Sequence, residues 1–457
     1  MDKHSIHGMW SSRLAFILAA SGSAVGLGNI WRFPYLASDN GGGAFVLIYL
    51  ACIVLVGLPI MAAEILMGRQ GRMSPVNTLR KLTREGGHSG GWTVIGWIGM
   101  VAAVLILSFY SVVGGWTMHY TWLYIAQIFG GAPITDPVAT FTGMLASPGT
   151  LIFWHSAFML VTVAVVAMGV EKGLERAVKF LMPLLFLILL GLLGYGISTG
   201  NVGQAVEFLF KPDFSEVTGD TLLAALGQAF FSLSLGMCGI MTYGAYLPRD
   251  VSIPRVAVVV SATDTSVALL AGLAIFPVLF TFGIAPAGGG PGLIFTSLPL
   301  AFNDMAFGIP YAVAFFGLLF VAAWTSSISL LEPPSAFLVE MGNLSRRTSA
   351  IIAAIFIWAI GLLTALGFNV LKDVKYTSAD GQTTRDIQGM VEFVASDLML
   401  PIGGLLIAIF AGYVLSREIA RSQLSQLSRA GFAIWRFLIC IVAPVLVLVV
   451  LGFKLFG

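Results

Sequence analysis

Long apolar runs separated by short polar segments fill almost the whole chain. A helix of about 20 residues crosses the roughly 30 Å of hydrocarbon in a bilayer, and each run is long enough for that. The pattern therefore predicts an all-α polytopic membrane protein with eleven transmembrane helices. Their expected ranges are 14–36, 42–68, 92–128, 150–169, 176–198, 221–247, 255–284, 310–340, 349–368, 391–414 and 431–455.

Composition supports this class and excludes others. Of the 457 residues, 58% are hydrophobic and only 10% are charged, whereas a soluble domain carries about 25% charged residues. The net charge of +2 is too small to indicate a nucleic-acid partner. Cys52, Cys238 and Cys440 all lie in apolar runs, which argues against a disulfide framework. No His/Cys metal cluster or nucleophile–base motif stands out in the sequence, so we expect no enzyme.

The basic residues orient the predicted spans, because cytoplasmic loops carry an excess of Lys and Arg. With a cytoplasmic N-terminus, the inside loops collect Arg69, Arg72, Arg80, Lys81, Arg84, Lys172, Arg176, Lys179, Arg249, Arg255, Arg346, Arg347, Arg417, Arg421 and Arg429. The outside segments then hold only Lys211, Lys372, Lys375, Arg385 and Lys454. An odd number of spans places the C-terminus outside.

The first apolar run is interrupted in its middle. Gly22, Gly26 and Gly28 fall within seven residues, and Asn29 and Arg32 follow at once. Glycine weakens a helix interior by about 1 kcal/mol against alanine, and an arginine at membrane depth normally faces protein or water. These features indicate a broken helix, whose freed carbonyl groups can hold a cation and whose free N–H groups can hold an anion.

A second interruption lies in the sixth run, where residues 230–239 mix Ser232, Ser234, Gly236 and Gly239 into an apolar helix. Because the second break lies five spans after the first, and five is odd, the second block starts from the opposite face of the membrane. This predicts a 5+5 inverted repeat with unwound helices 1 and 6. The expected units are 1–200, then 201–414 with an outer lid loop 285–306, then a last span in 415–457. The alternative is that these glycines only allow close helix packing.

Several motifs resemble one family closely. Gly22–Asn29, Trp31–Pro34 and Asn40–Phe45 resemble the first span and its exit in the neurotransmitter:sodium symporter family, as do three later segments: Gly227–Gly236, Gly292–Thr296 and Thr325–Ser327. The resemblance covers essentially the whole chain and is greatest to bacterial eleven-span amino acid transporters. It implies sodium-coupled symport across a bacterial inner membrane, with the lipid bilayer, sodium ions and an amino acid as partners.

The resemblance also implies a substrate site. The N–H groups of Leu27 and Gly28 would bind a carboxylate, since the N-terminal end of a helix favours anions. Relatives that carry amines without a carboxylate have an acid where this chain has Gly26, so the substrate is expected to bring its own negative charge. The implied substrate-binding residues are Ser23, Ala24, Gly26, Leu27, Gly28, Ile106, Tyr110, Phe231, Ser232, Ser234, Met237, Ser326 and Leu330. This mainly apolar set favours a hydrophobic L-amino acid.

Two sodium sites are implied in the same way, because sodium prefers oxygen ligands. The residues of site 1 would be Ala24, Asn29, Ser232 and Asp264, together with the substrate carboxylate. Those of site 2 would be Gly22, Val25, Ala322, Thr325 and Ser326. Many relatives have Asn at the position of Asp264 and bind chloride nearby through a serine, but this chain has Ala268 one turn further on. We expect Asp264 to supply that negative charge and transport to need no chloride; the alternative is a structural carboxylate.

Residues at the two mouths are expected to gate the site. By resemblance, Arg32 pairs with an acid of the tenth span, and Glu392 fits the family pattern better than Asp397. Phe231 would cap the substrate below this pair. The implied inner gate consists of Trp10, Tyr246 and Glu340. Glu64, in the middle of the second span, is expected to bond the unwound first span.

The expected function is therefore uptake of an amino acid by alternating access. The first-span break recognises only an anion, so a small ω-amino acid, glycine or taurine remains an alternative substrate for the same mechanism. An ion channel is the alternative from another class, and it would show conductance that does not saturate with an organic solute.

Overall fold

Nine long apolar helices dominate the computed structural model, within the residues that it describes, 9–284, 290–342, 344–377 and 384–456. Each is long and apolar enough to cross a membrane, and a bent pair at the N-terminus forms a tenth such segment. The nine are Gly43–Gly71, Gly90–Ile128, Pro148–Ala167, Val170–Ser198, Ile253–Thr281, Gly308–Gly342, Arg346–Gly367, Ile387–Val414 and Arg429–Phe453. Nine of the eleven predicted spans thus appear with ends shifted by a few residues.

Four of these segments are single helices, and most of the others contain a short π-helical turn. The single helices are α8 (Pro148–Ala167), α13 (Ile253–Thr281), α15 (Gly308–Gly342) and α16 (Arg346–Gly367). The composite ones are α3 (Gly43–Cys52), η2 (Ile53–Gly57) and α4 (Leu58–Gly71); η3 (Gly90–Thr93) and α6 (Val94–Ile128); η4 (Val170–Glu175) and α9 (Arg176–Thr199); α17 (Ile387–Glu392), η7 (Phe393–Met399), α18 (Leu400–Ile409) and η8 (Phe410–Val414); α20 (Arg429–Phe437), η9 (Leu438–Val442) and α21 (Ala443–Phe456).

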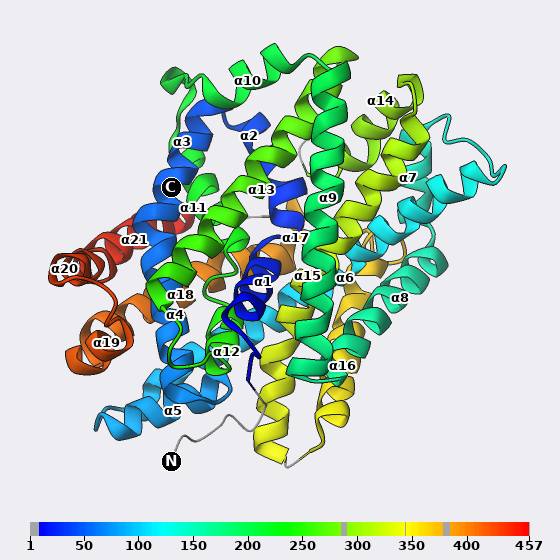
Figure 1. The fold of residues 1–457 in the computed structure, drawn as a ribbon. Coiled ribbons are helices and arrows are strands. Elements are labelled where there is room, and N and C mark those ends of the chain that lie inside the picture. The colour runs from blue at the N-terminus through cyan, green and yellow to red at the C-terminus, as the bar shows by residue number, and fades with distance from the viewer. Residues whose placement is uncertain (1–8, 285–289, 343, 378–383, 457) are drawn as a thin grey trace.

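Short elements connect the long helices at both ends of the bundle (Figure 1). The helical ones are α5 (Pro75–Glu85), α7 (Pro137–Ala146), α10 (Val202–Phe210), η5 (Phe214–Glu216), η6 (Leu293–Ser297), α14 (Leu298–Asp304) and α19 (Arg417–Gln423). Strands β1 (Tyr376–Thr377) and β2 (Thr384–Arg385) pair antiparallel. In Figure 1, α5 lies at the lower end of the bundle, and α10, α7 and α14 lie toward the upper end.

The predicted break in the first span is present. Helix α1 (Arg13–Ala24) ends at Val25, whose backbone is extended (φ −73°, ψ 105°). The chain resumes in η1 (Gly28–Arg32) and α2 (Phe33–Asp39), and the two halves are bent by 47°. Because the turn around Gly26 leaves the helical path, carbonyl groups at the end of α1 are available to other partners.

The sixth span is broken more completely, into α11 (Gly219–Ser232) and α12 (Gly239–Ala245). Three residues between the helices adopt a left-handed backbone, Ser234 (φ 55°), Gly236 (φ 78°) and Cys238 (φ 60°). Neither piece alone is long enough to count as a span, and the gap between them lies within residues 230–239, where the sequence predicted the second break.

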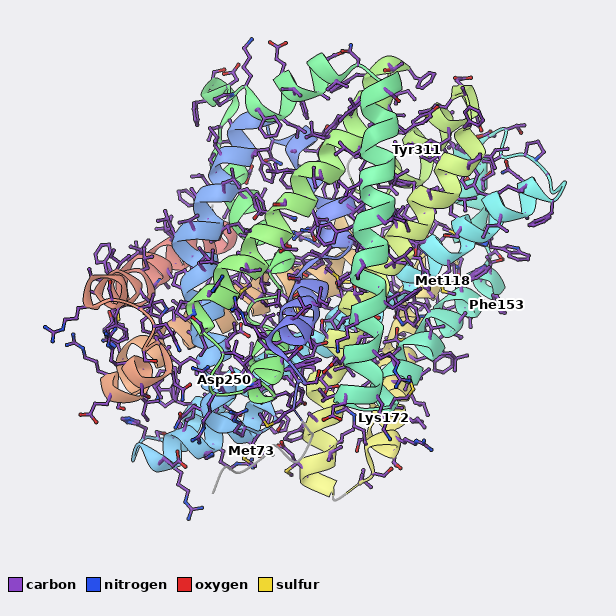
Figure 2. The ribbon with its side chains drawn as sticks, in the orientation of Figure 1. Met73, Met118, Phe153, Lys172, Asp250 and Tyr311 are labelled. Atoms are coloured by element: carbon purple, nitrogen blue, oxygen red, sulfur yellow. The ribbon has the colours of Figure 1, made fainter. Side chains whose placement is uncertain are left out.

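The broken helices lie inside the bundle. Helix α1, dark blue in Figure 1, packs against α13, α15, α9 and α12, and α12 also packs on α4. A Cβ at Gly68 of α4 would overlap the Met241 carbonyl, so the two backbones meet without a side chain between them. At the periphery, apolar side chains such as Phe153 of α8, 63% exposed, point outward (Figure 2). A lipid-facing surface suits these side chains.

Candidate functional site

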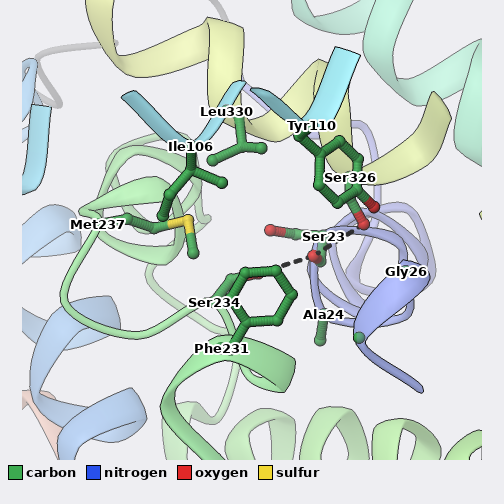
Figure 3. Close-up of a pocket in the computed structure, with 11 residues that line it drawn as sticks. Ser23, Ala24, Gly26, Ile106, Tyr110, Phe231, Ser234, Met237, Ser326 and Leu330 are labelled. Atoms are coloured by element: carbon green, nitrogen blue, oxygen red, sulfur yellow. Dashed lines mark hydrogen bonds between the residues drawn. The ribbon is translucent and has the colours of Figure 1, made fainter. Parts of the chain in front are cut away.

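A small cavity of about 20 Å³ lies between the two breaks (Figure 3). It is lined by Ser23, Ala24, Gly26, Gly28, Ile106, Tyr110, Phe231, Ser234, Met237, Ser326 and Leu330. All of these were named from the sequence as substrate-binding residues. The other two, Leu27 and Ser232, lie beside it: Leu27 donates its N–H to the Tyr110 hydroxyl at 3.1 Å. The structure therefore brings residues from α1, α6, α11 and α15 to one place.

Polar and apolar groups lie at opposite ends of this cavity. Ser23, Ser326 and the Tyr110 hydroxyl gather near Gly26, while Met237, Ile106 and Leu330 lie on the other side (Figure 3). The Ser234 hydroxyl donates to the Ser23 carbonyl at 2.8 Å and ties the two breaks together. An elongated molecule with one polar and one apolar end matches this division.

Gly26 allows the polar end to form. A Cβ at this position would overlap the Ser326 hydroxyl and come within 2.8 Å of the Tyr110 hydroxyl. Gly28 has a similar role, since its Cβ would meet the Phe231 ring at 3.0 Å. The first break is thus closely packed against three other elements.

An oxygen cluster lies beside the cavity, between α1 and α15. The Thr325 hydroxyl is 3.4 Å from the Val25 carbonyl and 3.0 Å from the Ala322 carbonyl. The Ser326 hydroxyl is 3.5 Å from the Gly22 carbonyl and 3.3 Å from the Val25 carbonyl. These are the five residues named for sodium site 2. A hard cation fits this set, because every donor is an uncharged oxygen and nitrogen ligands are absent from the five.

A second polar cluster surrounds Asp264 of α13, which is fully buried. Its carboxylate accepts hydrogen bonds from the Asn29 amide at 2.7 Å, the Ser232 hydroxyl at 2.8 Å and the Tyr49 hydroxyl at 3.2 Å. All three donors are neutral. A buried carboxylate with neutral partners keeps most of its charge uncompensated. A sodium ion placed among Asn29, Ser232 and Asp264 fits this donor set, if the amide turns its oxygen inward.

Sequence reasoning missed Tyr49 of this cluster and also Gln228, which bonds the first break. The Gln228 amide donates to the Gly28 carbonyl at 2.7 Å and so satisfies one group freed by the first break. Tyr49 belongs to α3 and Gln228 to α11, and each is a polar side chain in an apolar run. That contrast was a usable signal, although it does not indicate which helix the side chain faces.

Comparison with known proteins decides the family. A family model described as the sodium:neurotransmitter symporter family matches residues 7–129 and 136–456. The chain belongs to this family. The uncharacterised sodium-dependent transporter YhdH of Bacillus subtilis is 36% identical over 444 residues, which cover 96% of each chain. A sodium-dependent transporter of Haemophilus influenzae is 35% identical over 98% of each chain.

A solved structure agrees with these relatives. The crystal structure of MhsT in complex with L-phenylalanine superposes with a TM-score of 0.89 at 41% sequence identity. The match covers 97% of this chain and 99% of MhsT. The protein is therefore a membrane symporter of a sodium-dependent family and not an enzyme.

At one end of the symporter's cavity, Arg32 lies between two acids. Its guanidinium is 4.0 Å from Glu392 and 3.8 Å from Asp397, and it covers the Phe231 ring at 4.9 Å. The expectation that favoured Glu392 over Asp397 is therefore too narrow, because the π-helical turn η7 brings both acids to the same guanidinium. Arg32 and Glu392 line a second cavity of about 70 Å³, and Phe231 and Tyr110 line both cavities.

The segment predicted as a lid, 285–306, contributes residues to this second cavity. The Trp31 indole donates to the Gly290 carbonyl at 3.0 Å, and Gly290 and Pro291 line the cavity wall. The Tyr120 hydroxyl holds the Phe295 carbonyl at 3.1 Å. Part of the expected lid, 285–289, lies outside the described residues.

On the opposite side, Trp10 and Tyr246 meet as expected. The Trp10 N–H donates to the Tyr246 carbonyl at 3.2 Å, and its indole donates to the Tyr243 carbonyl at 3.2 Å. The carboxylate bonded to the Tyr246 hydroxyl, at 2.7 Å, belongs to Glu332, which also pairs with Arg346. Sequence reasoning did not name Glu332.

The acid that was expected at the inner gate, Glu340, bonds to residues around the start of α5. Glu340 accepts hydrogen bonds from the Ser74 N–H at 2.7 Å and the Asn77 amide at 2.6 Å, at the start of α5. Glu64 likewise differs from expectation, since it accepts from Gly236 N–H at 2.8 Å and Met241 N–H at 3.3 Å. It therefore bonds the unwound sixth span and not the first.

Proposed function

We propose that this symporter takes up a hydrophobic L-amino acid, driven by two sodium ions and independent of chloride. The observation that carries the proposal is the two-ended cavity between the breaks, polar near Gly26 and apolar near Met237. MhsT, 41% identical, was crystallised with L-phenylalanine, a molecule with a charged end and an apolar end.

In this proposal the substrate carboxylate lies at the start of η1. It accepts hydrogen bonds from the Leu27 and Gly28 N–H groups and from the Tyr110 hydroxyl, which already contacts Leu27. The amine meets the Ala24 and Phe231 carbonyls and Ser234. The side chain extends between Ile106, Met237 and Leu330, where burial of apolar surface contributes about 25 cal/mol per Å².

Sodium at site 1 would bind Ala24, Asn29, Ser232 and Asp264 and touch the substrate carboxylate. Sodium at site 2 would join Gly22 and Val25 of the first span to Ala322, Thr325 and Ser326 of α15. Because both sites include carbonyls of the first break, ion binding and the conformation of that break are linked. Each sodium that enters adds about 2.3 kcal/mol per 100 mV of membrane potential.

Chloride independence follows from Asp264. The carboxylate is buried and receives only neutral donors among its described contacts, so it supplies the negative charge that balances a sodium ion. Ala268, one turn further on, has no hydroxyl with which to hold an anion.

The gates and topology complete the proposal. Arg32, Glu392 and Phe231 close the outer side, and Trp10, Tyr246 and Glu340 lie on the inner side. Units 1–200 and 201–414 form two inverted repeats, followed by the last span in 415–457. The protein lies in the bacterial inner membrane with its N-terminus in the cytoplasm and its C-terminus outside.

A thermal-shift screen tests this function. Purified protein is heated with each of the twenty amino acids, γ-aminobutyrate, β-alanine or taurine, in sodium or in potassium. We expect aliphatic or aromatic amino acids to raise the melting temperature in sodium only. If only taurine or an ω-amino acid stabilises the protein, that compound is the substrate and not a hydrophobic amino acid. A separate measurement of ionic current would favour a channel if the conductance does not saturate with an organic solute.

A further inference from the structure

Arg69 lies near the C-terminal end of α4, and the residue is only 4% exposed. Its guanidinium donates to the Gln423 side-chain oxygen at 2.6 Å, the Gln423 carbonyl at 2.7 Å and the Val251 carbonyl at 2.6 Å. All the acceptors that it meets in the described part of the chain are uncharged oxygens. A buried charge held in this way is stable only while its acceptors stay in place.

The acceptors of Arg69 belong to two different elements. Val251 lies in the loop after α12, whereas Gln423 is the last residue of α19. In Figure 1, α19 lies to the left of α4 and α12 to its right, and both pack against it. Helix α19 connects the last two long segments, Ile387–Val414 and Arg429–Phe453. Arg69 therefore joins the broken sixth span to the end of the chain.

Gln423 is oriented for this contact by a second side chain. Its amide nitrogen donates to the Gln70 side-chain oxygen at 2.7 Å, while its amide oxygen accepts from Arg69. Since an arginine can only donate, the oxygen of the amide has to face it. Leu424, the next residue, is fully buried and fixes the end of α19. Gln423 thus cannot leave without breaking bonds to two neighbouring residues of α4.

This contact lies at the same end of the bundle as the contact between Trp10 and Tyr246. Arg72, three residues after Arg69, donates to the carbonyl of Leu247, the residue that follows Tyr246, at 2.5 Å. The proposed function places this end on the inner side, which opens when the broken spans move. Such a movement separates Arg69 either from the loop after α12 or from α19, because it is bonded to both.

We propose that the Arg69–Gln423 contact is a latch that holds the inner side closed and opens once in each transport cycle. It rests on the proposed function, because it assumes that the sixth span moves relative to the last two spans when the inner side opens. With the latch open, water has to replace both Gln423 oxygens at the guanidinium. The closed latch therefore favours the conformation in which the cavity and both proposed sodium sites are complete.

Two variants of Gln423 change the latch in opposite directions. Gln423→Leu removes the side-chain acceptor of Arg69, whereas Gln423→Glu replaces it with a carboxylate, which bonds a guanidinium more strongly. Each variant is measured by equilibrium binding of labelled L-phenylalanine in sodium and by sodium-driven uptake of the same molecule into proteoliposomes.

The two variants should differ in which parameter they change. We expect Gln423→Leu to weaken binding about threefold to tenfold, because a smaller fraction of the protein is in the binding-competent conformation. We expect Gln423→Glu to keep the binding affinity and to lower kcat about tenfold, because the strengthened latch opens less often. If Gln423→Leu does not fold, the kcat of Gln423→Glu decides the question.

A matched control lies one residue earlier on α19. Ser422 is exposed, and its hydroxyl bonds the Ile419 carbonyl within the same helix. Ser422→Glu adds the same negative charge to α19 without facing Arg69, so both parameters should stay within about twofold of the wild type. Gln423 variants that behave like Ser422→Glu, or that both change the same parameter in the same direction, would overturn the latch while the proposed function stands. Absence of sodium-driven uptake in the wild type would instead overturn the proposed function.

Discussion

The Asn29 amide lies 2.7 Å from the Asp264 carboxylate and joins the broken first span to α13 across 235 positions of sequence. Both side chains are fully buried. The pair links the element that changes direction at Gly26 to α13, a continuous helix of 29 residues. Any ion that enters between them therefore acts on the first break and on α13 at once.

Replacing Asp264 tests the charge of this pair. Asp264→Asn keeps the shape but removes the negative charge, and we expect the half-saturating sodium concentration to rise about tenfold to a hundredfold. Uptake by the wild-type protein is expected to be the same in chloride and in gluconate. A steep chloride dependence in the wild type would contradict the assignment of Asp264.

The oxygen cluster between α1 and α15 predicts that removing one of its hydroxyl groups lowers sodium affinity, whereas removing a neighbouring hydroxyl group does not. Ser326→Ala removes a hydroxyl that lies within 3.5 Å of carbonyls of the first break, so sodium affinity should fall about tenfold. Ser327→Ala is the control, because the Ser327 hydroxyl bonds Trp324 and Thr162 instead. Sodium titrations followed by melting temperature measure both. Equal effects of the two variants would argue against site 2.

Gly26 predicts a steric effect on substrate binding. Gly26→Ala places a methyl group against Ser326 and Tyr110, and substrate binding should become undetectable at millimolar concentration. Gly227→Ala is the control, since nothing lies within 4 Å of its added Cβ and α11 should tolerate it. Equilibrium binding of labelled L-phenylalanine distinguishes them. Normal binding by Gly26→Ala would show that the substrate lies elsewhere.

Because two acids lie near Arg32, we expect either carboxylate to compensate for the loss of the other. Each lies about one ion-pair distance from the guanidinium, so Glu392→Gln or Asp397→Asn alone should change transport by less than about fivefold. The double variant leaves Arg32 without either carboxylate and should reduce transport much more than the product of the two. Initial uptake rates decide this, and strictly multiplicative effects would show that the acids act independently.

The sequence predicted features whose cause is local. Apolar runs fix most of the spans, and the clusters of glycine and serine in Gly22–Gly28 and Ser232–Gly239 interrupt the first and sixth spans. The lining of the cavity came from the family motifs. The short helices α5 and α10 were not foreseen, because both are too short to stand out against the spans and α5 is also polar.

Contacts between distant elements could not be predicted in the same way. The sequence around Glu332 and Arg346 does not indicate whether these two side chains pair. Which of Glu392 and Asp397 lies near Arg32 depends on the π-helical turn η7, which the sequence did not predict. Glu64 was assigned to the wrong break because both unwound segments expose free N–H groups. Which one it meets is decided by the packing of α4 on α12.

The central claim is that sodium drives an amino acid through the cavity between the two breaks. The most direct measurement is uptake of labelled L-phenylalanine into proteoliposomes with an inward sodium gradient and no chloride. The account predicts accumulation above the external concentration, abolished when sodium is equal on both sides. Uptake that only equilibrates, or that proceeds equally in potassium, would contradict it.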